Sequence, residues 1–144
     1  MKKIVFLLFL LMPFCVFADD SICSTTIINS IYSIEEELNN CKIDMNNNQS
    51  TADMNEATYN SADCIIAVVH KVFDTFYTKR NKQVREDFDK LVVEIYKNCH
   101  NISQYSDMAD HATMRNTEAI SHANYIFRQI AKDYIQQMKS DCWL

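Results

Sequence analysis

The chain contains no glycine, and its only proline in 144 residues is Pro13. β-Sheets and tight turns normally depend on both residue types, because glycine reaches backbone angles that other residues avoid and proline fixes φ. An all-β or doubly wound α/β fold is therefore difficult to build from this sequence. Clusters of Asn, Ser and Thr must form the turns. Together with the apolar periodicity described below, this composition predicts an all-α fold.

The first 18 residues, MKKIVFLLFLLMPFCVFA, have the layout of a cleavable signal peptide: two lysines, an apolar run, and small residues before the cleavage point. The alternative is an N-terminal membrane anchor. The run over residues 4–17 has only 14 residues, whereas a spanning helix needs roughly 20. No other apolar run is long enough to span. We expect removal of residues 1–18 and secretion of residues 19–144 as a single helical domain, extracellular or, in a bacterium, periplasmic.

Helices are predicted at both ends of the mature chain. The first covers residues 21–42, and its apolar stripe has heptad-like spacing: Cys23, Ile27, Ile31, Ile34, Leu38 and Cys41. The last covers residues 107–140, with the apolar line Ala119, Ile120, Ala123, Phe127, Ile130, Tyr134 and Met138. Each stripe requires a packing partner, which favours a helical bundle.

Residues 61–101 contain two further amphipathic segments, separated by the polar sequence TKRNKQ. Asn81 is the best turn-former in this break, so we predict an antiparallel helical hairpin. Residues equidistant from such a turn lie side by side. Cys64 is 17 residues before Asn81 and Cys99 is 18 after it, and this symmetry predicts a disulfide between them.

One continuous helix over residues 52–100 is the alternative, because no glycine or proline enforces the turn. Such a helix would be roughly 73 Å long at the α-helical rise. A compact domain of this size has a radius of gyration of only about 14 Å. We therefore favour the hairpin, and with it a small disulfide-stapled bundle of about four helices in up-down topology.

Five cysteines remain after removal of the leader, and in an exported chain they are interpreted first as disulfides. In an up-down bundle the start of the first helix and the end of the fourth lie at the same end. Cys23 and Cys142 are therefore the second predicted pair. Cys41 is left over, either as a buried thiol on the stripe of the first helix, as a reactive thiol, or as the link of a disulfide-linked homodimer. It could also replace one member of the two pairs, because disulfide connectivity cannot be deduced from sequence alone.

Loss of Lys2 and Lys3 leaves 12 basic and 19 acidic residues, a net charge of −7. This balance argues against a general nucleic-acid binder, which needs a basic face. One basic cluster stands out at the predicted turn: Lys79, Arg80, Lys82 and Arg85. It is a candidate surface for an acidic partner, although cations at a helix C-terminus explain part of it.

The sequence offers little catalytic chemistry. Nucleophile elbows and glycine-rich phosphate loops are excluded by the lack of glycine, and no cysteine–histidine spacing matches a zinc site. The one candidate is a loop with His100, Asp107, Asp110 and His111, where a metal or acid–base pair is conceivable but matches no ligand signature. We predict no cofactor, no metal and no enzymatic activity.

Asn48 and Asn101 each begin an Asn-X-Ser triplet in a predicted loop, and they are possible glycosylation sites in a eukaryote. The leading functional hypothesis is an exported, non-catalytic protein that binds or inhibits another extracellular or periplasmic protein. The alternatives are a carrier of a small apolar ligand in the bundle core and, last, an enzyme or metal site at the loop from His100 to His111.

Overall fold

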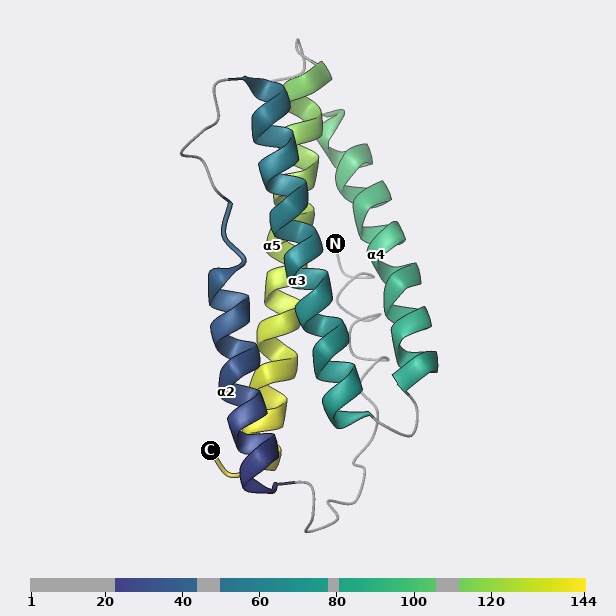
Figure 1. The fold of residues 1–144 in the computed structure, drawn as a ribbon. Coiled ribbons are helices and arrows are strands. Elements are labelled where there is room, and N and C mark those ends of the chain that lie inside the picture. The colour runs from purple at the N-terminus through teal and green to yellow at the C-terminus, as the bar shows by residue number, and fades with distance from the viewer. Residues whose placement is uncertain (1–22, 44–49, 78–80, 106–111) are drawn as a thin grey trace.

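The computed structural model describes residues 23–43, 50–77, 81–105 and 112–144. These residues form four α-helices: α2 Thr25–Asn40, α3 Thr51–Phe76, α4 Asn81–Ser103 and α5 Ala112–Asp141. Successive helices run in opposite directions along one bundle axis (Figure 1). The predicted all-α, up-down bundle is confirmed. The hairpin is confirmed too, since α3 and α4 are separate antiparallel helices.

The bundle is built around α3 and α5, the two longest helices, which pack against each other along much of their length (Figure 1). With 26 and 30 residues they are about 39 and 45 Å long. α2 has 16 residues and is only about 24 Å long, so it covers one half of this central pair. α4 lies on the opposite side and packs more closely on α5 than on α3.

The core follows the predicted stripes. Ile31 and Ile34 of α2, Ile65 and Val69 of α3, and Phe127 of α5 are completely buried. Phe73 lies at the centre of an aromatic group: its ring is 5.1 Å from Tyr134, 5.6 Å from Phe88 and 5.9 Å from Tyr77, each in an edge-on orientation. Edge-to-face pairs of this kind add about 0.5–1.5 kcal/mol each beyond the area that they bury.

Serine caps begin two of the helices. Ser50 and Asp53 form a reciprocal capping box at α3, with the Ser50 amide donating to Asp53 Oδ2 at 3.0 Å and the Asp53 amide donating to Ser50 Oγ at 3.2 Å. At α2, Ser24 Oγ accepts from the Ile27 amide. These side chains satisfy backbone donors that a helix leaves unpaired at its start.

At the end of α5 a residue other than glycine must adopt a positive φ, because the chain contains no glycine. Trp143 adopts a φ of 58°, a conformation in which helices usually place glycine. The Leu144 amide donates to the Lys139 carbonyl and the Trp143 amide to the Ser140 carbonyl, which completes a Schellman-type C-cap. The Trp143 side chain is 96% exposed, so the cap serves the backbone and adds nothing to the core.

The structure confirms one predicted disulfide and corrects the other. Cys23 pairs with Cys142, with 5.3 Å between the Cα atoms, as the up-down topology predicted. The predicted Cys64–Cys99 pair is wrong: Cys64 pairs with Cys41, at a Cα separation of 5.5 Å, and Cys99 is the free, buried thiol. The prediction assumed that α4 lies flat against α3, whereas α4 packs mainly on α5.

Cys41 therefore is not the unpaired thiol. It follows the last residue of α2 and is tied to the side of α3 that faces α2. Because its sulfur is bonded within the chain, Cys41 cannot serve the predicted disulfide-linked homodimer. Burial raises the pKa of Cys99, which makes its thiol a weaker nucleophile than an exposed cysteine.

No helix within the described part of the chain is long and apolar enough to cross a membrane. The predicted leader, residues 1–18, lies outside the described residues.

Candidate functional site

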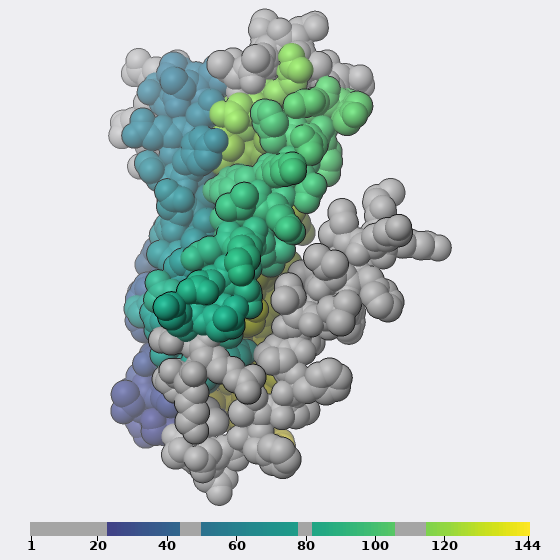
Figure 2. Space-filling view, turned by 90° about the vertical axis from the view of Figure 1, so that its right-hand side faces the viewer, coloured from purple at the N-terminus to yellow at the C-terminus, as the bar shows by residue number. Residues whose placement is uncertain are grey.

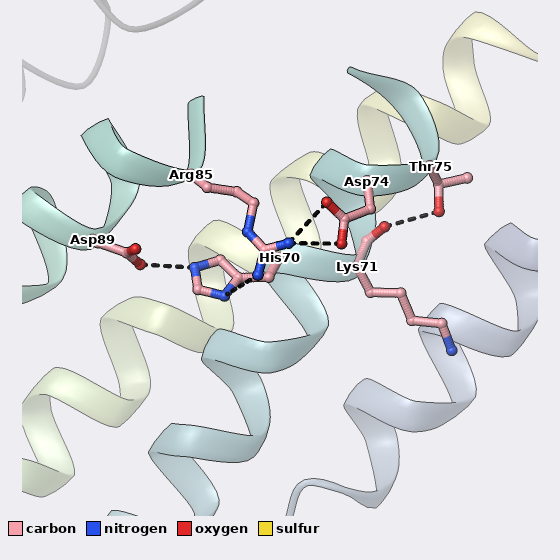
Figure 3. A network of polar contacts seen from close by, with 6 residues as sticks. All are labelled: His70, Lys71, Asp74, Thr75, Arg85 and Asp89. Carbon is pink, nitrogen blue, oxygen red and sulfur yellow. Dashed lines mark hydrogen bonds and ion pairs between the residues drawn. The ribbon is translucent and has the colours of Figure 1, made fainter. Parts of the chain in front are cut away.

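The predicted basic cluster is only partly described, because Lys79 and Arg80 lie outside the described residues. Arg85 does not project freely. It reaches back from α4 to α3, where its Nη1 donates to both carboxylate oxygens of Asp74 at 2.9 and 2.8 Å (Figure 3). Its charge is therefore largely matched within the protein. Lys82 is exposed and also has a partner.

A histidine–carboxylate pair continues this network between α3 and α4. His70 Nε2 lies 2.7 Å from Asp89 Oδ1, and Arg85 Nη2 lies 3.5 Å from His70 Nδ1 (Figure 3). Since the guanidinium can only donate, Nδ1 accepts, and the proton on Nε2 is directed at Asp89. Every described contact of this imidazole is to Arg85, Asp89 or the ring edge of Phe88. We interpret the network as a polar tie that holds α4 to α3.

A surface cleft lies at the opposite end of the α3–α4 pair. There the first half of α3 and the last turns of α4 diverge, and the start of α5 forms the floor between them (Figure 2). The cleft has a volume of about 290 Å³. Its lining consists of aromatic, small polar and aliphatic side chains: Tyr59, Tyr96, His100, Asn116, Ala119 and Ile120.

Two tyrosine rings form the aromatic wall of the cleft. The centroids of Tyr59 and Tyr96 are 6.3 Å apart, and their planes are inclined by 43°. Tyr96 is also held from behind by Phe127, at 5.2 Å in an edge-on contact. Tyr59 is 41% exposed, so its ring is accessible from solvent. The wall is therefore fixed on one side and open on the other.

The Tyr96 hydroxyl is buried, yet it has no hydrogen-bond partner among the described residues. Burial raises the pKa of Tyr96 to about 12, and the negative charge of Asp63 adds to this effect. The group is consequently a neutral phenol at physiological pH. Because an unpaired buried hydroxyl is unfavourable, it is a candidate for a bond to a bound group.

Hydrogen bonds between α3 and α5 fix the α3 wall of the cleft against its floor. Thr117 Oγ1 donates to Asn55 Oδ1 at 2.5 Å, and Asn124 Nδ2 donates to the Thr58 carbonyl at 3.3 Å. Thr58 and Asn124 are 2% and 5% exposed, so the second bond lies inside the bundle. The α3 and α5 sides of the cleft are thus set by a rigid framework before anything binds.

The predicted loop site is described only at His100. His100 belongs to α4 and lines the cleft, whereas Asp107, Asp110 and His111 lie outside the described residues. Within the described ranges, no group of three or more His, Cys, Asp or Glu side chains could hold a metal ion.

The predicted loop position of one Asn-X-Ser triplet is wrong. Asn101 is exposed in the last turn of α4, not in a loop, and Asn48 falls outside the described ranges.

Sequence reasoning singled out His100 and placed Ala119 and Ile120 on the apolar line of the last helix, but it missed Tyr59, Tyr96 and Asn116. Tyr59 and Tyr96 lie beside the apolar stripes of their helices, where an aromatic residue gives no distinctive signal. Their proximity depends on the register of α3 against α4, which separate stripes do not specify. Asn116 was likewise unmarked in the polar start of α5.

Searches with this chain find no match among protein-family models, curated proteins or solved structures.

Proposed function

We propose that this protein is an exported, non-catalytic interaction protein that receives a side chain of a partner protein in the cleft between α3, α4 and α5. The observation that carries the proposal is the accessible aromatic wall of Tyr59 and Tyr96 over a fixed floor of Ala119 and Ile120. Tyrosine is enriched among residues that dominate protein–protein binding energy, and such residues cluster around well-packed pockets.

Export is supported by the signal-peptide pattern of residues 1–18 and by two disulfides within the chain. The disulfides also limit the conformational freedom of α2, α3 and α5, and the last two of these helices form one wall and the floor of the cleft. A rigid binding surface loses less entropy on association, which favours affinity.

The carrier alternative is less well supported. At about 290 Å³ the cleft lies at the lower limit of small-molecule sites, which span roughly 300–1,000 Å³ and enclose most of the ligand. It is a surface recess and not a chamber between the helices. The bundle centre is instead filled by Phe73 and Phe127, both fully buried.

The basic cluster remains a prediction with less support. Arg85 is already paired with Asp74, so its use in binding would first require the loss of that ion pair. The cleft needs no such rearrangement.

The proposal can be tested by photo-crosslinking in the compartment that receives the protein. A benzoylphenylalanine replaces Tyr59 in the cleft or, as the matched control, Tyr125, a 71% exposed tyrosine of α5. We expect a single protein adduct from position 59 and none from position 125. Equal adducts at both positions, or none at position 59, would contradict the proposal.

The crosslinked protein, once identified and purified, allows a direct binding measurement. Asn116→Arg places a long side chain in the cleft, and we expect it to weaken binding at least tenfold. Asn98→Arg adds the same group at an exposed position of α4 and should leave affinity unchanged. Both variants must retain the helical circular dichroism of the wild type.

A further inference from the structure

We propose that the group received by the cleft is a cationic side chain, arginine in first place, so that the partner protein presents a basic residue here. This inference rests on the proposed function and specifies the chemistry of the partner. It is carried by the aromatic rings, the oxygen acceptors and the charge distribution around the cleft.

The aromatic rings suit a planar cation. Tyr59 and Tyr96, with centroids 6.3 Å apart, present an accessible π surface. A guanidinium or ammonium group over the face of a tyrosine is attracted by the ring quadrupole. Arginine fits better than lysine because its flat guanidinium also stacks on aromatic faces while directing N–H groups sideways.

Two oxygen acceptors lie close to the rings. The buried Tyr96 hydroxyl has no hydrogen bond among the described residues. The Asp63 carboxylate lies one helical turn after Tyr59, is exposed, and acts electrostatically on the Tyr96 hydroxyl. A guanidinium has five N–H donors and no acceptor, so it suits a site that offers oxygen acceptors, above all a carboxylate.

The charges along α3 favour the same sign of ligand. Residues 43–70 contain no Lys or Arg, and they contain Asp53, Glu56 and Asp63 on α3 itself. The wall that carries Tyr59 is therefore acidic. A surface of one charge sign raises the local concentration of the opposite charge and accelerates encounter.

Arg115 is a basic side chain near the cleft, and its positive charge would disfavour a bound cation. It precedes Asn116 on α5, and its Nε is buried without a partner among the described residues. Glu118, three residues further along the helix, has a buried carboxylate oxygen that is likewise unpartnered. The two charges offset each other in sum, and α3 adds the acidic side chains named above.

The test is an NMR titration of the full processed chain with N-acetyl-arginine amide. N-acetyl-citrulline amide has nearly the same shape without the charge, and N-acetyl-glutamate amide carries the opposite charge. We expect saturable amide shifts at residues 59, 96 and 100 with the arginine probe and binding about tenfold weaker, or more, with citrulline. Equal affinity for arginine and citrulline, or tighter binding of glutamate, would overturn the inference.

Charge variants sharpen the result. Asp63→Asn should lower the affinity for the arginine probe about fivefold. Glu86→Gln changes an exposed acidic residue near the other end of α4 and should leave this affinity unchanged. Arg115→Gln should tighten binding of the arginine probe. Weaker binding by Arg115→Gln, or equal effects of the Asp63 and Glu86 variants, would count against a cation.

The outcomes separate this inference from the proposed function. A protein adduct at position 59 without saturable binding of the arginine probe would overturn the preference for a cation, whereas the proposed protein-binding function would stand. Binding of the arginine probe without any protein adduct would support the cation preference and overturn protein binding.

Discussion

Tyr96 combines two opposing contributions to stability. Its ring packs against Phe127 at 5.2 Å and against Tyr59 at 6.3 Å, which favours the folded state. Its hydroxyl, by contrast, is buried with no hydrogen-bond partner among the described residues. A buried polar group left unpaired costs on the order of 1–3 kcal/mol. The two ends of one side chain are therefore expected to respond differently to mutation.

Tyr96→Phe tests this separation. Removing the hydroxyl while keeping the ring should leave the free energy of unfolding unchanged or raise it by about 1 kcal/mol. The same variant should bind the arginine probe more weakly, because the cleft loses a hydrogen-bond acceptor. Urea denaturation and the NMR titration measure the two effects. Tyr125→Phe, at an exposed site, is the control; a clear loss of stability in Tyr96→Phe would mean that the hydroxyl is in fact satisfied.

Two tyrosines make stability depend on alkaline pH. Burial raises the pKa of Tyr96 and of Tyr134 to about 12, from the ordinary value of 10.0. Their protonated forms are favoured in the folded state, so the contribution to stability is fully present below about pH 10. Above that, the unfolded chain ionises first, and stability is lost as the pH rises towards 12.

We therefore expect the free energy of unfolding to fall between pH 10 and pH 12, and less steeply in Tyr96→Phe. Absorbance at 295 nm follows the ionisation, and urea titrations at each pH follow the stability. Ionisation of all seven tyrosines near pH 10 in the folded protein would contradict this assignment.

Among the elements, α4 is the helix that no disulfide secures. Neither disulfide includes it, since its cysteine, Cys99, is free. Its strongly buried side chains are few: Phe88, Cys99 and Ser103. Towards α3 it is held by the ion pairs of Arg85 with Asp74 and of His70 with Asp89. We expect α4 to open locally before α3 and α5 do.

Arg85→Gln should increase this opening. The ion pair is half-exposed, so its loss should cost only about 0.5–1 kcal/mol, even though the geometry is two-pronged. Buried Cys99 reports on the opening because an alkylating reagent reaches its thiol only when α4 moves. We expect faster alkylation of Cys99 in Arg85→Gln, measured by intact mass. Lys90→Gln, which removes an exposed pair within α4, should leave the rate unchanged.

The sequence predicted the helices themselves, but it did not predict how they pack side by side. The stripes of residues 21–42 and 107–140 predicted helices, and the up-down order then placed Cys23 beside Cys142. The Cys41–Cys64 pair and the cleft of Tyr59 and Tyr96 depend on how α2 and α4 lean on the central pair. That lateral packing is set by side-chain fit between helices, which the periodicity of each separate helix does not contain.

At the scale of the whole molecule, the two disulfides act on the same helix. Cys23–Cys142 fixes the start of α2 and Cys41–Cys64 fixes its end. Lys71 and Lys139 also form ion pairs with Glu37 and Glu35 of α2. The shortest helix is therefore the one secured most firmly.

The two disulfides should differ in their effect on stability because they close chain segments of different length. The sequence separations are 119 for Cys23–Cys142 and 23 for Cys41–Cys64. In the chain-entropy model these correspond to about 5 and about 3.4 kcal/mol. The Cys23→Ser/Cys142→Ser variant should accordingly be the less stable of the two double variants in urea. The opposite order would show that local packing around Cys41 outweighs chain entropy.

The Cys23–Cys142 disulfide has a consequence for what a protease can do to this chain. This outer link joins the chain just before α2 to the chain just after α5, so every peptide bond between residues 23 and 142 is bridged by it, and the bonds between residues 41 and 64 are bridged a second time by Cys41–Cys64. A protease that cuts once between any pair of helices cannot release a fragment. On a non-reducing gel the nicked chain keeps its full mass, and its pieces separate only when a reductant is added. Such a chain can lose the continuity of its backbone and still present the cleft as one molecule.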